Sequence, residues 1–250
     1  MTSLQGFTTT SPSPLPLSSA QPSALQHDPA SDLSYRTLDM PLPAGAVVPR
    51  PQALLLLLHG VGGNEMQLAA LGQLLDARTK VVLVRAPLEF GPGQFGWFQV
   101  SFGPQGPSIH PAQAETSRQQ LGQLVACLQS ASGIDPAHTV MAGFSQGGIM
   151  SAGLALTEPQ QLGGFGLLSG RILPEIAPQI GTPEALARLA GFVAHGEFDD
   201  KLPLAWAERA SARLTQLGVP HQLNIYPAGH QLTPDMAHDF VTWLTARYLT

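Results

Sequence analysis

A serine between two glycines is the residue whose setting most clearly favours covalent chemistry. Gly143, Ser145 and Gly147 form the pattern G-x-S-x-G, in which a sharp strand-to-helix turn exposes the serine hydroxyl. Residues 138–143 read as a buried strand, and residues 146–157 as a helix of small and apolar residues. The glycines are needed because side chains would collide where strand and helix pass. We therefore predict that Ser145 is a nucleophile; the alternative is a glycine-rich turn with an incidental serine.

A histidine near the C-terminus offers the general base that a serine nucleophile needs. His230 follows the apolar strand expected at 221–226 within a Pro-Ala-Gly-His loop. Three other histidines compete with it: His195, His221 and His238. His221 begins a strand and so lies at the wrong end of the sheet, and His238 lies within an expected helix. We predict that His230 is the base.

Three carboxylates follow the strand expected at 190–194 and could orient that base. Glu197, Asp199 and Asp200 lie within four residues of one another in a single loop. A carboxylate in this role fixes the tautomer of the imidazole, whereas the others would be solvated loop charges. Residue chemistry alone leaves all three open.

Two backbone amides are expected to stabilise the negative charge that develops on an attacked carbonyl oxygen. The first belongs to Gln146, at the start of the helix after the serine. The second is expected from the glycine-rich loop 59–63, where we predict the amide of Val61. This loop lacks a P-loop lysine and the G-x-G-x-x-G spacing, which disfavours phosphate binding. We interpret His59 as a buried hydrogen-bonding residue, with a second base as the alternative.

Alternating apolar runs and helical segments predict the sheet that must position these groups. This alternation is typical of an α/β fold in which a mostly parallel sheet of about seven strands carries helices on both faces. Residues 52–58 and 80–84 are apolar on both faces, as interior strands are, whereas the more polar first strand is expected at an edge. The expected strands are 34–39, 52–58, 80–84, 138–143, 164–168, 190–194 and 221–226. The expected helices are 65–77, 112–131, 146–157, 203–217 and 234–249.

Composition predicts a single folded domain behind a disordered leader. The chain has 250 residues, of which 44% are hydrophobic, enough for one substantial core. Residues 1–30 are rich in Ser, Pro, Thr and Gln and are expected to be disordered, with the catalytic domain over 31–250. No secretory signal is evident there, so we expect a cytoplasmic protein. The longest aliphatic run, 53–58, is too short for a membrane anchor.

Charge and cysteine content narrow the classes of partner. The net charge is −5 and the basic residues are scattered, which argues against nucleic-acid binding. A single cysteine, Cys127, cannot form an internal disulfide and is expected in the core.

The segment 88–111 is rich in Gly, Pro and aromatic residues without regular periodicity. We expect it to form a long irregular loop that lines a pocket; the alternative is a hydrophobic surface loop folded onto the core. Its exposed hydrophobic surface allows a homodimer.

Five segments together resemble the phospholipase/carboxylesterase family of α/β-hydrolases, which includes acyl-protein thioesterases and small bacterial carboxylesterases. The match is closest to the bacterial carboxylesterase branch, where Gly170-Arg171 also fits. The matching segments are Leu57-Leu58-His59-Gly60-Val61-Gly62, the run 143–148, the run 167–170, His195-Gly196-x-x-Asp199-x-x-Leu202-Pro203 and Tyr226-x-x-Gly229-His230.

The resemblance implies the α/β-hydrolase fold and selects among the open alternatives. The family pattern places the acid at Asp199, four residues after the histidine of the His-Gly pair. It also implies substrate contacts at Trp97, Phe98 and Gly60. We accordingly expect a serine carboxylesterase that needs no metal or cofactor. The stretch between Ser145 and Asp199 is too short for a large lid, and the open site expected without one favours small-molecule esters of short or medium acyl chain. The alternatives are a thioesterase or lysophospholipase, an acyltransferase, and a binding module that retains the fold without catalysis.

Overall fold

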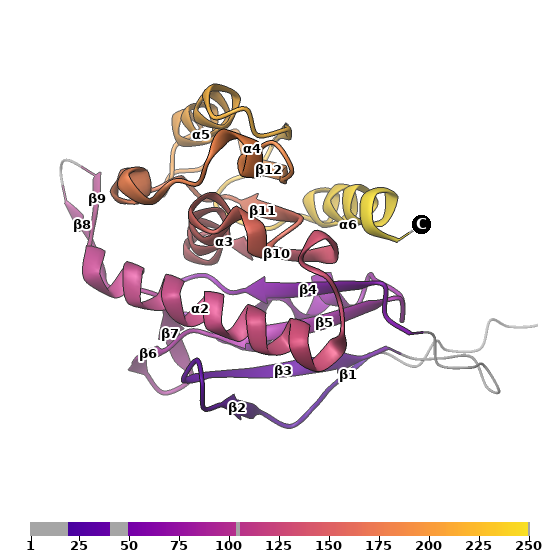
Figure 1. The fold of residues 1–250 in the computed structure, drawn as a ribbon. Helices are drawn as coiled ribbons and strands as arrows, with labels where there is room; N and C mark the ends of the chain where they lie inside the picture. The colour runs from indigo at the N-terminus through magenta and orange to yellow at the C-terminus, as the bar shows by residue number, and fades with distance from the viewer. Residues whose placement is uncertain (1–19, 41–49, 104–105, 250) are drawn as a thin grey trace, which may run out of the picture.

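A nine-stranded sheet forms the centre of the molecule (Figure 1). The computed structural model describes residues 20–40, 50–103 and 106–249. The strands run in the order β1-β3-β5-β4-β10-β11-β12-β13, and β2 also pairs with β3. All pairs from β5 to β13 are parallel, whereas β1, β2 and β3 pair antiparallel. Their bounds are β1 Gln21–Pro22, β2 Gln26–Asp28, β3 Leu33–Asp39, β4 Ala53–Leu58, β5 Thr79–Arg85, β10 Thr139–Phe144, β11 Gly164–Leu168, β12 Ala190–Gly196 and β13 His221–Tyr226. All seven expected strands are thus present.

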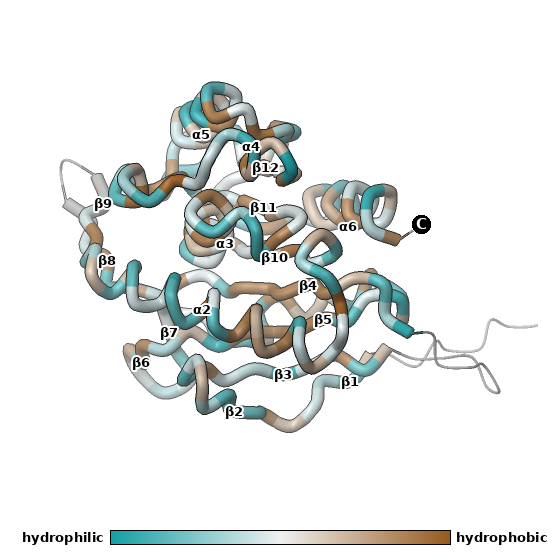
Figure 2. Tube along the Cα trace, in the orientation of Figure 1, coloured by the Kyte–Doolittle hydropathy of each residue, from teal (hydrophilic) through white to brown (hydrophobic). Residues whose placement is uncertain are grey.

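Interior strands bury both faces of the sheet. In β4, Leu54, Leu56 and Leu58 join one hydrophobic cluster, and Leu55 and Leu57 join the other. The alternation follows from the period of two along a strand. Figure 2 shows β4 as a largely hydrophobic strand in the middle of the fold. Both clusters form because helices cover the sheet on each side.

Helices cover the two faces in separate groups. One cluster contains side chains of α2, α3 and α5, and the other contains those of α1 and α6. The helices are η1 Glu65–Leu68, α1 Ala69–Gly72, α2 Pro111–Ser132, η2 Pro136–His138, α3 Gln146–Thr157, η3 Pro159–Gln161, η4 Pro174–Gln179, α4 Pro183–Leu186, α5 Ala205–Gln216 and α6 Pro234–Tyr248. The helix expected over 65–77 is shorter than predicted. Among the described residues, no helix combines the length and apolar character that crossing a bilayer requires.

The N-terminal edge corrects two expectations. The part of the expected leader from residue 20 onward is ordered, because β1 and β2 pair with β3; residues 1–19 lie outside the described residues. Consequently β3 is not the edge strand. The short strands are polar, so composition alone did not reveal them; their backbone groups bond to β3, and Pro22 is tolerated because β1 forms the edge.

The segment 88–111 also differs from its expected irregular loop. It forms two antiparallel hairpins, one of β6 (Leu88–Gly91) with β7 (Gln94–Gly96) and one of β8 (Val100–Gly103) with β9 (Gly106–Ile109). Gly93 has a φ of 72°, which lets the first hairpin turn tightly. The periodicity was hidden because these strands are only three or four residues long.

Candidate active site

Ser145 lies in the turn between β10 and α3, as its motif predicts. Its φ of 54° is in the left-handed region, which is rare for residues other than glycine. A Cβ atom on Gly143 would overlap the backbone of Gly147, and one on Gly147 would overlap the carbonyl of Leu58. Strand and helix can therefore pass this closely only with glycine at both positions.

His230 and Asp199 complete a hydrogen-bonded chain with the serine. His230 Nε2 lies 2.9 Å from Ser145 Oγ, and His230 Nδ1 lies 2.7 Å from Asp199 Oδ2. The ring of Phe144 packs on the imidazole, with centroids 5.0 Å apart. A Cβ on Gly196 would overlap the carbonyls that precede His230, so this glycine lets the two loops meet. The three side chains lie at the carboxyl ends of β10, β12 and β13.

The second carboxylate oxygen of Asp199 is held by its own loop. Asp199 Oδ1 accepts hydrogen bonds from the amides of Lys201, at 2.9 Å, and Leu202, at 2.8 Å. The side chain of Asp200 is 74% exposed and pairs with Lys201 instead, and Glu197 is exposed. Of the three candidate carboxylates, only Asp199 therefore reaches the histidine.

The competing histidines have other contacts. His195 is fully buried, and its Nε2 lies 2.6 Å from the carbonyl of Leu202 and 3.4 Å from Asp199 Oδ2. His221 bonds to Ser211 at 2.7 Å, and His238 lies exposed on α6. None of the three bonds to Ser145; His195 instead supports the loop of Asp199.

The two expected oxyanion donors both line the cavity above Ser145. Among the described residues, neither the Val61 amide nor the Gln146 amide donates a hydrogen bond. The loop of Val61 is fixed on both sides, because Gly60 N donates to Gln67 Oε1 at 2.7 Å and Gly62 N donates to the Phe95 carbonyl at 2.8 Å. Both amides are thus free to bind an anionic oxygen.

His59 is a buried hydrogen-bonding residue, as we interpreted it. Its Nε2 accepts from the amide of Ala86 at 3.0 Å, and Nδ1 lies 2.7 Å from the carbonyl of Gly60. Burial lowers the pKa of His59, which favours the neutral ring that these bonds require. The ring fixes the start of the glycine loop to the end of β5.

Trp97 does not contact the cavity, which corrects its expected role as a substrate contact. Its side chain is fully buried, and its indole N–H donates to the carbonyl of His59 at 2.9 Å. Trp97 therefore supports the glycine loop from behind. Phe98 and Gly60 do line the cavity. The side chain of Gln146 holds this segment by bonding Trp97 N at 2.8 Å and the Phe98 carbonyl at 2.7 Å.

The cavity has a volume of about 290 Å³ and mostly apolar walls. Gln67 and Arg171 also line it, and neither was expected to do so. Arg171 follows the end of β11, so its position after a buried strand was the available signal, because parallel strand ends converge at one edge of a sheet. The apolar wall comprises Val61, Phe98, Val100, Ile109, Phe144, Ile149 and Leu202.

Comparison with known families assigns this fold. A family model described as phospholipase/carboxylesterase matches residues 47–247, most of the chain. The chain belongs to the phospholipase/carboxylesterase family. Membership agrees with the enzyme class expected from the sequence, a carboxylesterase-type serine hydrolase, and with the α/β-hydrolase fold.

Relatives within the phospholipase/carboxylesterase family include thioesterases and esterases. The chain is 40% identical over 96 residues to acyl-protein thioesterase 1 from Emericella nidulans, covering 35% of this chain and 37% of that protein. It is 33% identical over 125 residues to acyl-protein thioesterase 1 from Eremothecium gossypii, covering 47% and 51%. The chain thus matches about half or less of the length of these curated relatives.

Solved structures resemble the whole fold. The esterase PE8 superimposes with a TM-score of 0.72 at 28% identity, covering 86% of this chain and 99% of that one. A carboxylesterase from Mesorhizobium loti has a TM-score of 0.71 at 20% identity, covering 91% and 99%. At 20% identity, the likeness to the Mesorhizobium loti carboxylesterase concerns the fold alone.

Proposed function

We propose that this chain hydrolyses carboxylic esters through Ser145, His230 and Asp199. The observation that carries the proposal is the continuous hydrogen-bonded chain of these residues, with distances of 2.9 and 2.7 Å, at the floor of a cavity. Such an arrangement activates a serine hydroxyl, which is otherwise a weak nucleophile.

The proposed reaction has two stages. His230 Nε2 takes the proton from Ser145 Oγ as that oxygen attacks the acyl carbon, and the amides of Val61 and Gln146 bind the resulting oxyanion. The imidazolium then donates its proton to the leaving alcohol. Water then attacks the acyl-enzyme with His230 again as base; the bond between the acyl carbon and Ser145 Oγ breaks, His230 returns the proton to Ser145, and the carboxylic acid leaves. Asp199 keeps Nδ1 protonated throughout.

The cavity favours esters of short or medium acyl chain. Its volume of about 290 Å³ is at the small end of ligand pockets. The seven apolar wall residues offer contacts to an aliphatic chain, and the small volume limits the length of chain that they can enclose.

Ester turnover by wild type and Ser145→Ala tests the proposal. Release of 4-nitrophenol is measured from acetate, butyrate, octanoate and palmitate esters. We expect kcat/KM to peak at short or medium chains, and the variant to lose at least about 10³-fold of the activity. Activity that survives in Ser145→Ala, or a preference for palmitate, would contradict the proposal.

Thioester hydrolysis is a second candidate function. It is favoured by the curated relatives, three of which are named acyl-protein thioesterase 1. The same residues would attack a thioester, with a thiol as the leaving group. A thioester of matched acyl length, assayed in parallel, distinguishes the two: a kcat/KM well above that of the oxygen ester would favour the thioesterase.

A further inference from the structure

Arg171 is a buried cation at the wall of the active-site cavity. The residue is only 7% exposed, and it lines the cavity together with Ser145 and His230. A Cβ on the preceding residue, Gly170, would lie 3.1 Å from the carbonyl of Ser145. Arg171 therefore directly follows a residue that packs against the backbone of Ser145. Arg171 has no role in the ester hydrolysis by Ser145 and His230 described so far.

The guanidinium of Arg171 is held by an aromatic ring and not by a carboxylate. Its Cζ lies 4.7 Å from the ring centroid of Trp206, and Arg209 lies 5.1 Å from the same centroid. Within the described part of the chain, Arg171 forms no ion pair and its side chain donates no hydrogen bond. Glu175 acts on it electrostatically but is exposed and outside ion-pair distance. Stacking on a ring uses the face of the guanidinium and leaves its N–H edge free.

The charges around the cavity are unbalanced. Arg171 and Lys201 are the cations that line it, and no lining residue is a carboxylate; Lys201 pairs with Asp200 at 3.2 Å, so Arg171 is the lining cation whose charge has no counterion. Asp199, which lies beneath His230, is already engaged by that ring and by two amides. Burial lowers the pKa of Arg171, which reflects the cost of removing its charge from water. A buried charge without a counterion is unfavourable, so this site is suited to receive an anion.

We propose that Arg171 binds a carboxylate on the substrate, so that this enzyme prefers small esters that carry a free carboxylate group. This inference rests on the proposed ester hydrolysis and names its substrate class. A carboxylate matches a guanidinium edge with two parallel hydrogen bonds. It also carries one negative charge, which balances one buried cation, whereas a phosphate dianion would bring an excess charge into the apolar cavity.

Matched pairs of esters test the preference. The 4-nitrophenyl monoesters of succinic, glutaric and adipic acids are compared with the same esters whose free carboxylate is capped as a methyl ester, with spontaneous hydrolysis subtracted. These pairs place the anion on the acyl side. A further pair, 4-acetoxybenzoate and its methyl ester, places it on the leaving alcohol. In the wild type, we expect kcat/KM for the anionic member to exceed that of the capped member by about tenfold or more in at least one pair.

Three variants assign the preference to Arg171. In Arg171→Met, the ratio of anionic to capped kcat/KM should fall by about tenfold or more, because the variant loses both the positive charge and the forked pair of N–H donors of the guanidinium. Arg171→Lys keeps the charge but not the fork and should give an intermediate ratio. Arg209→Met is the matched control, because it removes a guanidinium from the other contact on Trp206, outside the cavity lining; its ratio should equal that of the wild type.

The outcomes separate this inference from the function on which it rests. Hydrolysis of the capped esters without an anionic preference in any pair overturns the role of Arg171 but leaves ester hydrolysis standing. A preference that persists in Arg171→Met also overturns it. Absence of turnover for every ester overturns the proposed function and this inference together. Thermal unfolding verifies folding of each variant; if Arg171→Met does not fold, the wild-type ratios and Arg171→Lys decide the question.

Discussion

Ser145 holds a backbone conformation that its surroundings must impose. A non-glycine residue with φ of 54° costs about 1–3 kcal/mol. Its amide donates to the carbonyl of Leu168 at 2.8 Å, and its carbonyl accepts from the amide of Ile149 at 3.1 Å. These bonds to β11 and α3 over-determine the turn. The hydroxyl is consequently presented to His230 before any substrate binds.

Asp199→Asn tests the orientation of the proposed base. An amide in place of the carboxylate cannot hold the Nδ1 proton in the same way, so the imidazole loses the tautomer that accepts from Ser145. We expect kcat to fall by about 10³- to 10⁴-fold while KM changes little, measured with 4-nitrophenyl butyrate.

Asp200→Asn is the matched control for that substitution. Its carboxylate is one residue away but exposed, and its side-chain ion pair is with the exposed Lys201. Its kcat should stay within about threefold of the wild type, since exposed ion pairs contribute little. If Asp200→Asn lost activity and Asp199→Asn kept it, the acid would be misassigned.

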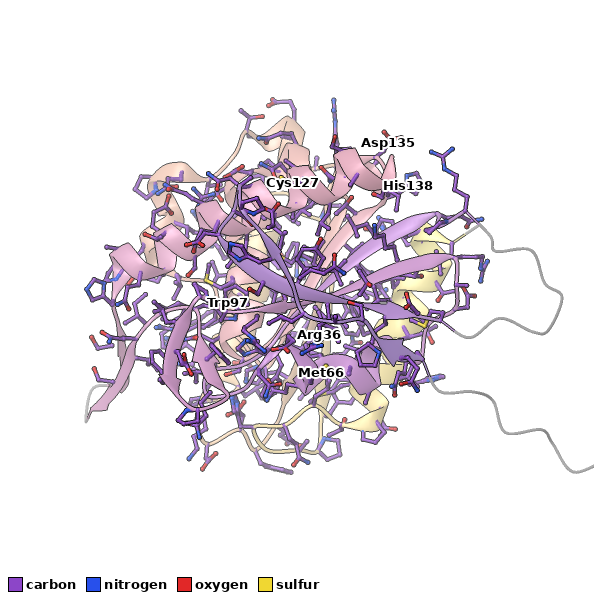
Figure 3. The ribbon with its side chains drawn as sticks, turned by 90° about the horizontal axis from the view of Figure 1, so that it is seen from below. Arg36, Met66, Trp97, Cys127, Asp135 and His138 are labelled. Atoms are coloured by element: carbon purple, nitrogen blue, oxygen red, sulfur yellow. The ribbon has the colours of Figure 1, made fainter. Side chains whose placement is uncertain are left out.

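At the scale of elements, a buried carboxylate joins η1 to two strands. Glu65, at the start of η1, is 3% exposed and bonds to Arg36 of β3 at 2.9 Å and to Arg85 of β5 at 2.7 and 2.8 Å. Figure 3 labels Arg36 and the neighbouring η1 residue Met66 at this place. Because η1 follows the glycine loop directly, the pair of arginines helps to fix the position of Val61.

Glu65→Gln should destabilise the fold in a pH-dependent way. Burial alone would raise the pKa of Glu65, but hydrogen bonds from Arg85 and Arg36 outweigh it and hold the pKa at about 2, below the ordinary 4.5. The folded state therefore binds this proton less tightly than the unfolded chain. The resulting stabilisation is complete above about pH 4.5 and is lost as pH falls towards 2.

Urea unfolding of wild type and Glu65→Gln measures this effect. We expect a loss of about 2 kcal/mol in the free energy of unfolding at pH 7, and a smaller difference at pH 3. Glu208→Gln, on the exposed face of α5, should differ from wild type by less than about 0.5 kcal/mol. If the loss of unfolding free energy in Glu65→Gln did not become smaller on acidification, this would contradict the negative charge assigned to Glu65.

At the scale of the whole molecule, β1 and β2 protect one edge of the sheet. They pair with Leu38, Asp39 and residues 33–35 of β3, and the carbonyl of Ser23 accepts a bond from Arg36 at 2.8 Å. Without them, β3 would present unpaired backbone groups along its length, which favours association with other chains.

Two shortened chains test this protection. A chain that begins at Leu33 lacks both strands, whereas a chain that begins at Ala20 keeps them. We expect the shorter chain to unfold at a temperature lower by about 5 °C or more and to elute with concentration-dependent self-association. Equal thermal stability and equal elution of the two chains would argue against a protective role.

Strong local signals made much of the fold and of the proposed chemistry predictable. The run Ala53–Leu58 had to be an interior strand because both of its faces are apolar. The glycines around Ser145 indicated the turn because no other residue fits there. His230 was preferred because it follows a strand, where the ends of parallel strands bring loops together.

Other features were decided only by tertiary contacts. Asp199 and Asp200 are chemically identical neighbours, and only the path of the loop turns one inward and the other to solvent. Trp97 and Phe98 are adjacent aromatic residues, yet one supports the glycine loop and the other lines the cavity. The charge of Arg171 could be proposed to bind a substrate only because the fold buries this residue without a neighbouring carboxylate. The order in β1 and β2 likewise depends on pairing with β3.

Sequence by itself determined where strands end and which chemical groups follow them, because those signals are local. Which of these groups face one another depended on three-dimensional packing, because burial and contact join residues far apart in the chain.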